Sequence, residues 1–77
     1  MIYPNSANLS PREVEILILV CNEASNNEIL EKLFISKRTV EGHKNKIFRK
    51  TKSKSSIGLI QFAIRNKLIF IIHQFDD

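Results

Sequence analysis

The sequence has few of the residues that build disulfides, metal sites or β-sheets. Its 77 residues include one cysteine, two glycines, two prolines and no tryptophan. A lone cysteine cannot form an intrachain disulfide, so a reducing cytoplasm is expected. Cys21, His43 and His73 lack metal-ligand spacing, so we expect no metal or other cofactor and place Cys21 in the core. The scarcity of glycine, proline and alternating β-branched residues argues against a sheet.

The sequence also lacks the signatures of membrane proteins and of enzymes. Its longest apolar run, 68–72, is far shorter than the roughly 20 residues of a membrane-spanning helix. We find no nucleophile–base–acid set, no glycine-rich phosphate loop and no paired carboxylates, and therefore expect no enzymatic activity. With 43% apolar residues, the chain should form one small domain whose thin core depends on helix packing or on a partner.

Positive charge is concentrated in one segment, residues 36–54. This segment holds eight basic residues and one acidic residue, so it carries +7 while the whole chain carries +4. The remainder of the chain therefore sums to −3. Such a segment suits a phosphate-lined groove, because lysine and arginine displace counterions from a polyanion. A solvated basic surface without a ligand is the alternative interpretation.

The first helix is predicted over about 11–22. Ser10 can cap it, Pro11 suits its first turn, and Glu13 can complete a capping box. Apolar residues then recur at i, i+3, i+4 and i+7, which predicts one buried face. That face consists of Val14, Leu17, Ile18 and Cys21.

A short second helix and a longer third helix follow with about three residues between them. Ser25 and Glu28 form a second capping box before a helix ending near 33, and Ser36 can cap a helix over about 37–51. A short helix, a tight turn and a longer basic helix are typical of a helix-turn-helix unit.

Apolar residues in this unit should fix how the basic helix is held. Phe34 or Ile35 is expected to pack beneath the turn, and a core role is expected for each of them. Val40 and Ile47 recur at helical spacing, which buries one side of the third helix and leaves the other side polar.

A fourth helix is predicted over about 56–66, between a domain start at 9 and a tail at 70–77. Residues 1–8 read as a linker or lead-in, and 9–69 as the domain. The helix has two nearly opposite apolar faces, of which so small a domain needs only one, so the other is expected to meet a partner. The faces are Ile57, Ile60 and Ile64 on one side and Leu59, Phe62 and Ala63 on the other.

Several short motifs at consistent spacing cover most of the chain. They are Leu9-Ser10-Pro11-Arg12-Glu13, Glu15-Ile16-Leu17, Ser25-Asn26-Asn27-Glu28-Ile29, Leu33-Phe34-Ile35-Ser36, Thr39-Val40 with His43, Asn45-Lys46-Ile47 and Arg49-Lys50. As a set they resemble the DNA-binding domain of the LuxR/FixJ (GerE-type) transcription regulators. That domain is commonly the C-terminal output module of bacterial response regulators.

The resemblance implies an all-α, four-helix, bundle-like helix-turn-helix domain without a wing. Its third helix would enter the major groove of duplex DNA, and its fourth would pair with a second copy, with RNA polymerase as a candidate further partner. The implied base-facing residues are Glu41, Gly42 and Asn45. The implied phosphate contacts are Ser36, Arg38, Thr39, Lys44, Lys46 and Arg49, and the interface residues are Leu59, Phe62 and Ala63.

Glu41 and Asn45 are the candidate readers of base identity. An acid facing the groove repels phosphate but can accept a hydrogen bond from cytosine N4, and Asn45 could bind adenine with two hydrogen bonds. Gly42 allows close approach but reads little. A solvated pair between Glu41 and Lys44 or Lys37 is the alternative for the acid.

Three positions depart from the pattern that this family usually shows. Glu23 replaces a glycine after the first helix, so that corner should be built differently. Leu30 replaces a small residue between the second and third helices, which should separate them slightly. Thr51-Lys52-Ser53 replaces Leu-Gly-Val, so the third helix should run longer or fray at its end.

Two other functions remain open from the sequence. A sigma-factor region-4-like helix-turn-helix has a similar start, although the apolar fourth helix favours the first interpretation. A protein-interaction module that uses both apolar faces would not bind DNA. Salt-dependent binding to duplex DNA separates this last alternative from the others.

Overall fold

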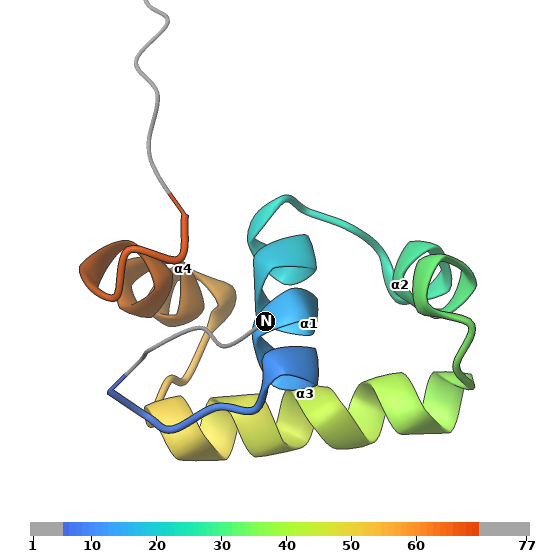
Figure 1. The fold of residues 1–77 in the computed structure, drawn as a ribbon, viewed down its shortest axis with the longest axis horizontal. Helices are drawn as coiled ribbons and strands as arrows, with labels where there is room; N and C mark the ends of the chain where they lie inside the picture. The colour runs from blue at the N-terminus through green and yellow to red at the C-terminus, as the bar shows by residue number, and fades with distance from the viewer. Residues whose placement is uncertain (1–5, 70–77) are drawn as a thin grey trace, which may run out of the picture.

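The computed structural model describes residues 6–69, and all regular structure in this part of the chain is helical. The helices are α1 (Pro11–Cys21), α2 (Asn26–Leu33), α3 (Lys37–Thr51) and α4 (Ser56–Arg65). Figure 1 shows α3 along one side of the molecule, with α1 at the centre and α2 and α4 at opposite ends. The predicted all-α fold is confirmed, and the predicted bounds agree to within one residue. The predicted tail, 70–77, lies outside the described residues.

Serine caps begin the first three helices as predicted. In the first capping box, the Glu13 N–H donates to Ser10 Oγ at 3.1 Å and the Ser10 N–H donates to Glu13 Oε1 at 2.8 Å. Ser25 and Glu28 make the same reciprocal pair at the start of α2. Each box satisfies two backbone groups at its helix start, which sets the first residue of the helix.

The core lies where α3, α1 and α4 meet, with α2 packed on α3. Ile16 is fully buried although it lies outside the predicted apolar stripe of α1. The reason is that α3 covers one side of α1 and α4 covers another. The buried apolar residues are Leu9, Val14, Ile16, Leu17, Ile29, Val40, Ile47, Leu59, Phe62 and Ala63. Cys21, expected in this core, is half-buried at its edge, and burial raises the pKa of its thiol.

Contacts with the domain begin before the predicted boundary at Leu9. The Ser6 N–H donates to Asn66 Oδ1 at 2.7 Å, and Ala7 packs against the core. The last residues of the expected lead-in are therefore joined to the end of α4.

The apolar faces of α4 are used in the opposite way to the prediction. Leu59, Phe62 and Ala63 are at most 4% exposed, because they fill the core against α1 and α3. Their assignment to a dimer interface is therefore wrong. Ile57 on the other face is 67% exposed, so that face, and not the buried one, is accessible to a partner.

The turn between α2 and α3 places only one of its two apolar residues inward. Phe34 takes the left-handed conformation with φ 57° and is 92% exposed, so its predicted core role is wrong. This conformation closes α2 and reverses the chain, which brings the following residue back toward the helix it terminates. Ile35 then packs against the core, and its N–H donates to the Leu30 carbonyl at 3.1 Å.

The corners after α1 and α3 also use the left-handed conformation without glycine. Glu23 after α1 has φ 64°, and Lys52 after α3 has φ 57°. Of the two alternatives expected for the end of α3, a longer helix or a frayed end, the longer helix is not found, because Lys52 ends α3 at the residue where the family usually has glycine. Thr51 secures this end: its hydroxyl donates to the Ile47 carbonyl at 2.8 Å and is 2.8 Å from the Ser53 hydroxyl.

Replacing Glu23 with glycine is expected to stabilise the domain by roughly 0.5–1 kcal/mol. Glycine removes the steric cost of a Cβ at positive φ, and this gain exceeds its greater loss of chain entropy. Urea unfolding followed by circular dichroism measures the change. Glu31→Gly, at an exposed helical position in α2, should instead destabilise by about 1 kcal/mol. A Glu23→Gly variant that loses stability would contradict this account of the corner.

Candidate nucleic-acid interface

The basic helix α3 is held by two fully inward residues. Val40 and Ile47 are buried, as predicted, and lie on the same side of the helix. At about 100° per residue, the positions opposite them form one continuous strip. The members of this outward strip are exposed, and they are Arg38, Gly42, Asn45 and Arg49.

Glu41 and Lys46 flank the outward strip on its two sides, and both are exposed. Within the described part of the chain, neither makes an ion pair or a side-chain hydrogen bond. The pairing of Glu41 with Lys44 or Lys37 considered above is therefore not formed. Arg38 and Arg49 are likewise unpaired over residues 6–69, so three guanidinium or ammonium groups and one carboxylate face solvent around the strip.

The remaining predicted phosphate residues lie at the edges of this surface. Lys44 is half-buried beside α2, where its Nζ donates to Asn26 Oδ1 at 3.0 Å. Ser36 caps α3 by accepting the Thr39 N–H at 3.1 Å, and the two hydroxyls are 2.8 Å apart. The structure thus exposes Arg38, Lys46 and Arg49 together on one side of α3. Lys44 lies nearer the neighbouring helix, and Ser36 and Thr39 lie nearer the turn.

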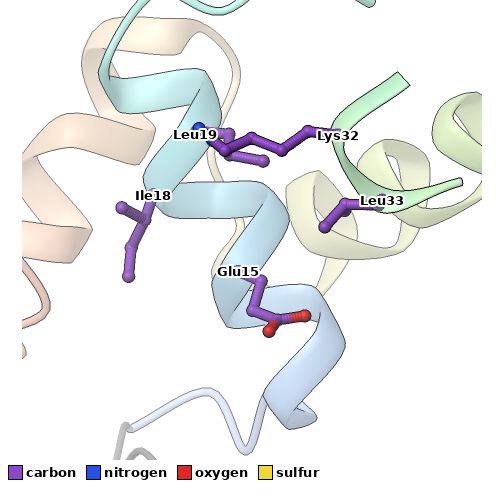
Figure 2. A pocket seen from close by; sticks show the side chains of 5 residues that line it. All are labelled: Glu15, Ile18, Leu19, Lys32 and Leu33. Atoms are coloured by element: carbon purple, nitrogen blue, oxygen red, sulfur yellow. The ribbon is translucent and has the colours of Figure 1, made fainter. Parts of the chain in front are cut away.

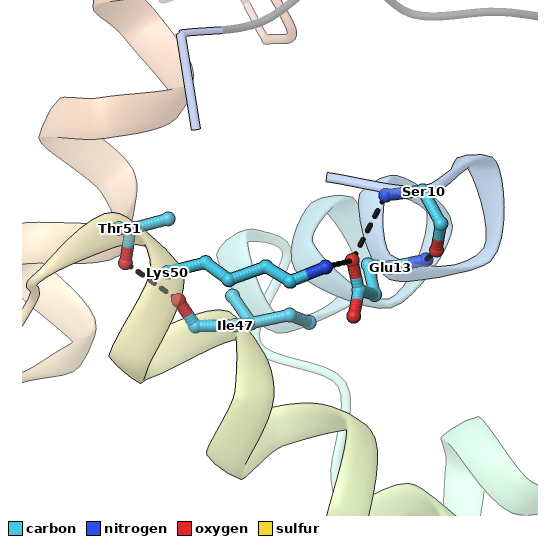
Figure 3. Close-up of polar contacts among 5 residues, drawn as sticks. All are labelled: Ser10, Glu13, Ile47, Lys50 and Thr51. Carbon is cyan, nitrogen blue, oxygen red and sulfur yellow. Dashed lines mark hydrogen bonds and ion pairs between the residues drawn. The ribbon is translucent and has the colours of Figure 1, made fainter. Parts of the chain in front are cut away.

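Sequence reasoning did not identify the ion pair between Lys50 and Glu13, which joins α3 to α1. Figure 3 shows Lys50 reaching from α3 to the start of α1, where Nζ lies 2.9 Å from Glu13 Oε1. Burial raises the pKa of Glu13, but hydrogen bonds from Lys50 and Ser10 outweigh it, and the net pKa is lowered. The carboxylate is therefore charged at neutral pH. The only sequence signal was the capping-box role of Glu13, which does not identify a partner 37 residues away.

A shallow hollow lies between α1 and α2, away from the outward strip. Figure 2 shows its lining, which is apolar apart from one acidic and one basic residue. It exists because both helices pack on α3. The lining residues are Glu15, Ile18, Leu19, Lys32 and Leu33.

Residues 6–69 contain neither a metal-binding cluster nor a membrane-spanning helix. No cluster of three or more histidine, cysteine, aspartate or glutamate side chains is placed to hold a metal ion there. None of the helices in that range is long and apolar enough to cross a bilayer.

A short helix, a tight turn and a longer helix with an exposed basic face define a helix-turn-helix domain. Residues 7–63 match the GerE family, described as bacterial regulatory proteins of the luxR family. The chain belongs to this family of DNA-binding regulators, as its motifs predicted. This membership also decides against the sigma-factor alternative.

Two relatives match most of this chain and are themselves longer. It is 48% identical over 61 residues to the oxygen regulatory protein NreC of Staphylococcus carnosus and, equally, to that of Staphylococcus aureus strain JH9. That stretch is 79% of this chain and 28% of each relative.

Two solved structures share the fold. The response regulator ChrA of a heme-sensing two-component system superposes with a TM-score of 0.73 and 36% identity, covering 86% of this chain and 32% of ChrA. A Vibrio cholera VqmA–ligand–DNA complex gives a TM-score of 0.72 and 28% identity, covering 94% of this chain and 31% of VqmA. The chain thus spans about a third or less of the length of each of these four proteins.

Proposed function

We propose that this chain is the DNA-binding part of a longer transcription regulator and that α3 reads duplex DNA from the major groove. The observation that carries the proposal is the outward strip, because it presents two arginines with a glycine and an asparagine between them on one exposed side. Membership of the family and likeness to a protein solved with DNA support it. RNA polymerase and an upstream signalling domain are the further partners that such a regulator would have.

Within this proposal, the cations at the ends and edge of the outward strip bind phosphate, and the residues in its middle face the bases. Arg38, Lys46 and Arg49 are exposed and unpaired within residues 6–69, so binding phosphate would break no contact described there. Lys44 can reach phosphate while keeping its bond to Asn26, since an ammonium has three donors. Ser36 and Thr39 would add hydroxyl contacts at the helix start.

Selection of bound duplexes from a random DNA pool tests the proposal most directly. The expected result is a short preferred half-site whose binding weakens as salt rises. An adenine read by Asn45 and a cytosine read by Glu41 are the contacts we expect to appear as fixed positions. A protein-interaction module would enrich no sequence and would bind no duplex at low salt.

The surroundings of the two glycines, Gly42 and Gly58, differ. A Cβ built on Gly58 would lie 3.2 Å from the Ser53 Cβ, so packing within the domain favours glycine there. A Cβ on Gly42 would meet nothing within 4 Å. Glycine in an exposed helix interior costs about 1 kcal/mol relative to alanine, and nothing described in the domain requires it at Gly42. We infer that the absence of a side chain at Gly42 allows α3 to approach the floor of the DNA groove closely.

Gly42→Leu is therefore expected to change stability and DNA binding in opposite directions. Leucine should stabilise the folded domain by about 1 kcal/mol through helix propensity. It should weaken binding to the selected duplex by about tenfold or more, because the side chain would occupy space that bases need. Urea unfolding and fluorescence anisotropy measure the two effects. Unchanged affinity in the stabilised variant would remove Gly42 from the base-facing set.

We propose that α4 pairs with a second copy through the face that the core leaves open. That face comprises Ile57, which is 67% exposed, with Ile60 and Ile64 half-buried beside it. An apolar face of this kind costs free energy in water unless a partner covers it. Two linked copies gain affinity because the second contact becomes effectively intramolecular.

Ile57→Asp should lower affinity for a duplex with two half-sites by about tenfold or more, while affinity for a single half-site stays unchanged. Titrations of both duplexes at the same salt concentration measure the difference. Phe34→Asp is the matched control for oligomeric state, since Phe34 is also exposed but lies in the turn at the other end of α3. In sedimentation of the free protein, only Ile57→Asp should reduce self-association. An equal loss of self-association in both variants would mean that the two copies do not pair through this face of α4.

A further inference from the structure

Lys50 differs from the other cations of α3 in having a buried counter-ion. Its Nζ lies 2.9 Å from Oε1 of Glu13, a residue only 4% exposed. The same Oε1 accepts the Ser10 N–H at 2.8 Å. Glu13 is thus committed to the start of α1 and to Lys50 at once, whereas Lys46 and Arg49 have no such partner within residues 6–69.

The partner of Lys50 is a carboxylate, whereas the partner of Lys44 is the neutral amide of Asn26. A phosphate that drew Lys50 away would leave the carboxylate without its cation, and a phosphate that shared Lys50 would meet a charge that is already balanced. An unpaired charge in a poorly solvated position is costly, so exchanging one anion for another gains little. A phosphate contact contributes to the salt dependence of binding only if the protein cation displaces counterions that are condensed on the DNA. Lys50, already neutralised inside the domain, should contribute nothing to that dependence.

The pair also acts on the orientation of α3. At about 100° per residue, Lys44 and Lys50 fall on opposite sides of the line through Val40 and Ile47. Lys44 is tied to Asn26 at the start of α2, and Lys50 is tied to Glu13 at the start of α1. Two ties on opposite flanks resist a roll, by which we mean rotation of α3 about its own axis.

We propose that Lys50 is a positioning residue: paired with Glu13, it prevents α3 from rolling and so fixes which side chains face the bases, without itself binding phosphate. This inference rests on the proposed DNA-binding function. A roll would move Asn45 and Arg49 sideways relative to the groove floor. Losing the pair should therefore reduce discrimination between sequences, whereas losing a phosphate contact weakens all sequences alike.

The test compares Lys50→Met with Lys46→Met, which removes the same charge from the same helix at an exposed, unpaired position. Affinity is measured over a range of salt for the selected duplex and for that duplex with one preferred base pair replaced. Lys46→Met should flatten the salt slope by about one unit and keep the ratio of the two affinities. Lys50→Met should keep the slope and shrink the ratio by about threefold or more, since one base contact is worth at least that much.

Two results overturn the proposal. A slope reduced by about one unit in Lys50→Met would make Lys50 a phosphate contact, and an unchanged ratio would deny it a positioning role. If Lys50→Met fails to fold, the double variant Glu13→Gln with Lys50→Met removes both charges and keeps an acceptor for Ser10, and the same two readouts decide. Failure of the unaltered protein to bind any selected duplex refutes the DNA-binding function instead, which separates the two hypotheses.

Discussion

Replacing Arg38, Lys46 and Arg49 together with glutamine is expected to reduce affinity for the selected duplex by about 500-fold at about 0.1 M salt. Each phosphate contact changes the salt slope by about 0.9, which corresponds to about eightfold in affinity at this concentration. The three residues are exposed and unpaired within residues 6–69, so their removal should leave the fold intact. Anisotropy titrations at several salt concentrations should show a slope flatter by about 2.7 units.

A second triple variant separates contact from net charge. Lys32, Arg65 and Lys67 are exposed and lie outside α3, and replacing them with glutamine changes the net charge by the same amount. Long-range attraction should fall slightly in this control, and the salt slope should stay within about half a unit of the original. An equal loss in both triple variants would mean that overall charge, not the face of α3, determines affinity.

The sequence predicts those parts of the fold that depend on neighbours along the chain. Helix starts follow from local hydrogen bonds, and Ser10 with Glu13 or Ser25 with Glu28 can be recognised four residues at a time. The inward position of Val40 and Ile47 follows from helical spacing alone. These two results together place the outward strip of α3 before any coordinates are known.

The parts that the sequence left open depend on contacts between distant segments. Periodicity shows that α4 has two apolar faces, but only the packing of α1 and α3 decides that Leu59 and Phe62 are covered and Ile57 is not. Phe34 was misplaced for a different reason. An aromatic residue favours burial, yet closing α2 in the left-handed conformation turns this side chain outward.

The non-glycine corners illustrate the limit of reasoning from a family pattern. Glycine is the cheapest residue at positive φ, and its absence at Glu23 and Lys52 suggested another backbone path. Both residues nevertheless adopt the positive φ that a glycine would take at these corners. Packing on either side of each corner fixes the chain direction more strongly than the roughly 1–2 kcal/mol cost of a left-handed residue opposes it.

Glu13→Ala is expected to lower the free energy of unfolding by about 3 kcal/mol, a large share of the roughly 4–11 kcal/mol available to a domain of this size. The variant removes the acceptor for the Ser10 N–H, the partner of Lys50 and the capping box of α1. Urea unfolding measures the loss. Glu15→Ala is the matched control, because Glu15 is exposed and its Oε1 is 3.7 Å from Arg12 Nε, a geometry that contributes little.

The same comparison should depend on pH in a defined direction. The pKa of Glu13 in the folded domain is below its ordinary value of 4.5, so folding favours the charged carboxylate. Its stabilisation is then fully present above about pH 4.5 and is lost as pH falls through the lower, folded-state pKa. The difference in stability between the unaltered domain and Glu13→Ala should therefore be constant near neutral pH and narrow below about pH 4.5. A difference that widened on acidification would mean that Glu13 is held in its neutral form, and the ion pair with Lys50 could not then be what joins α1 to α3.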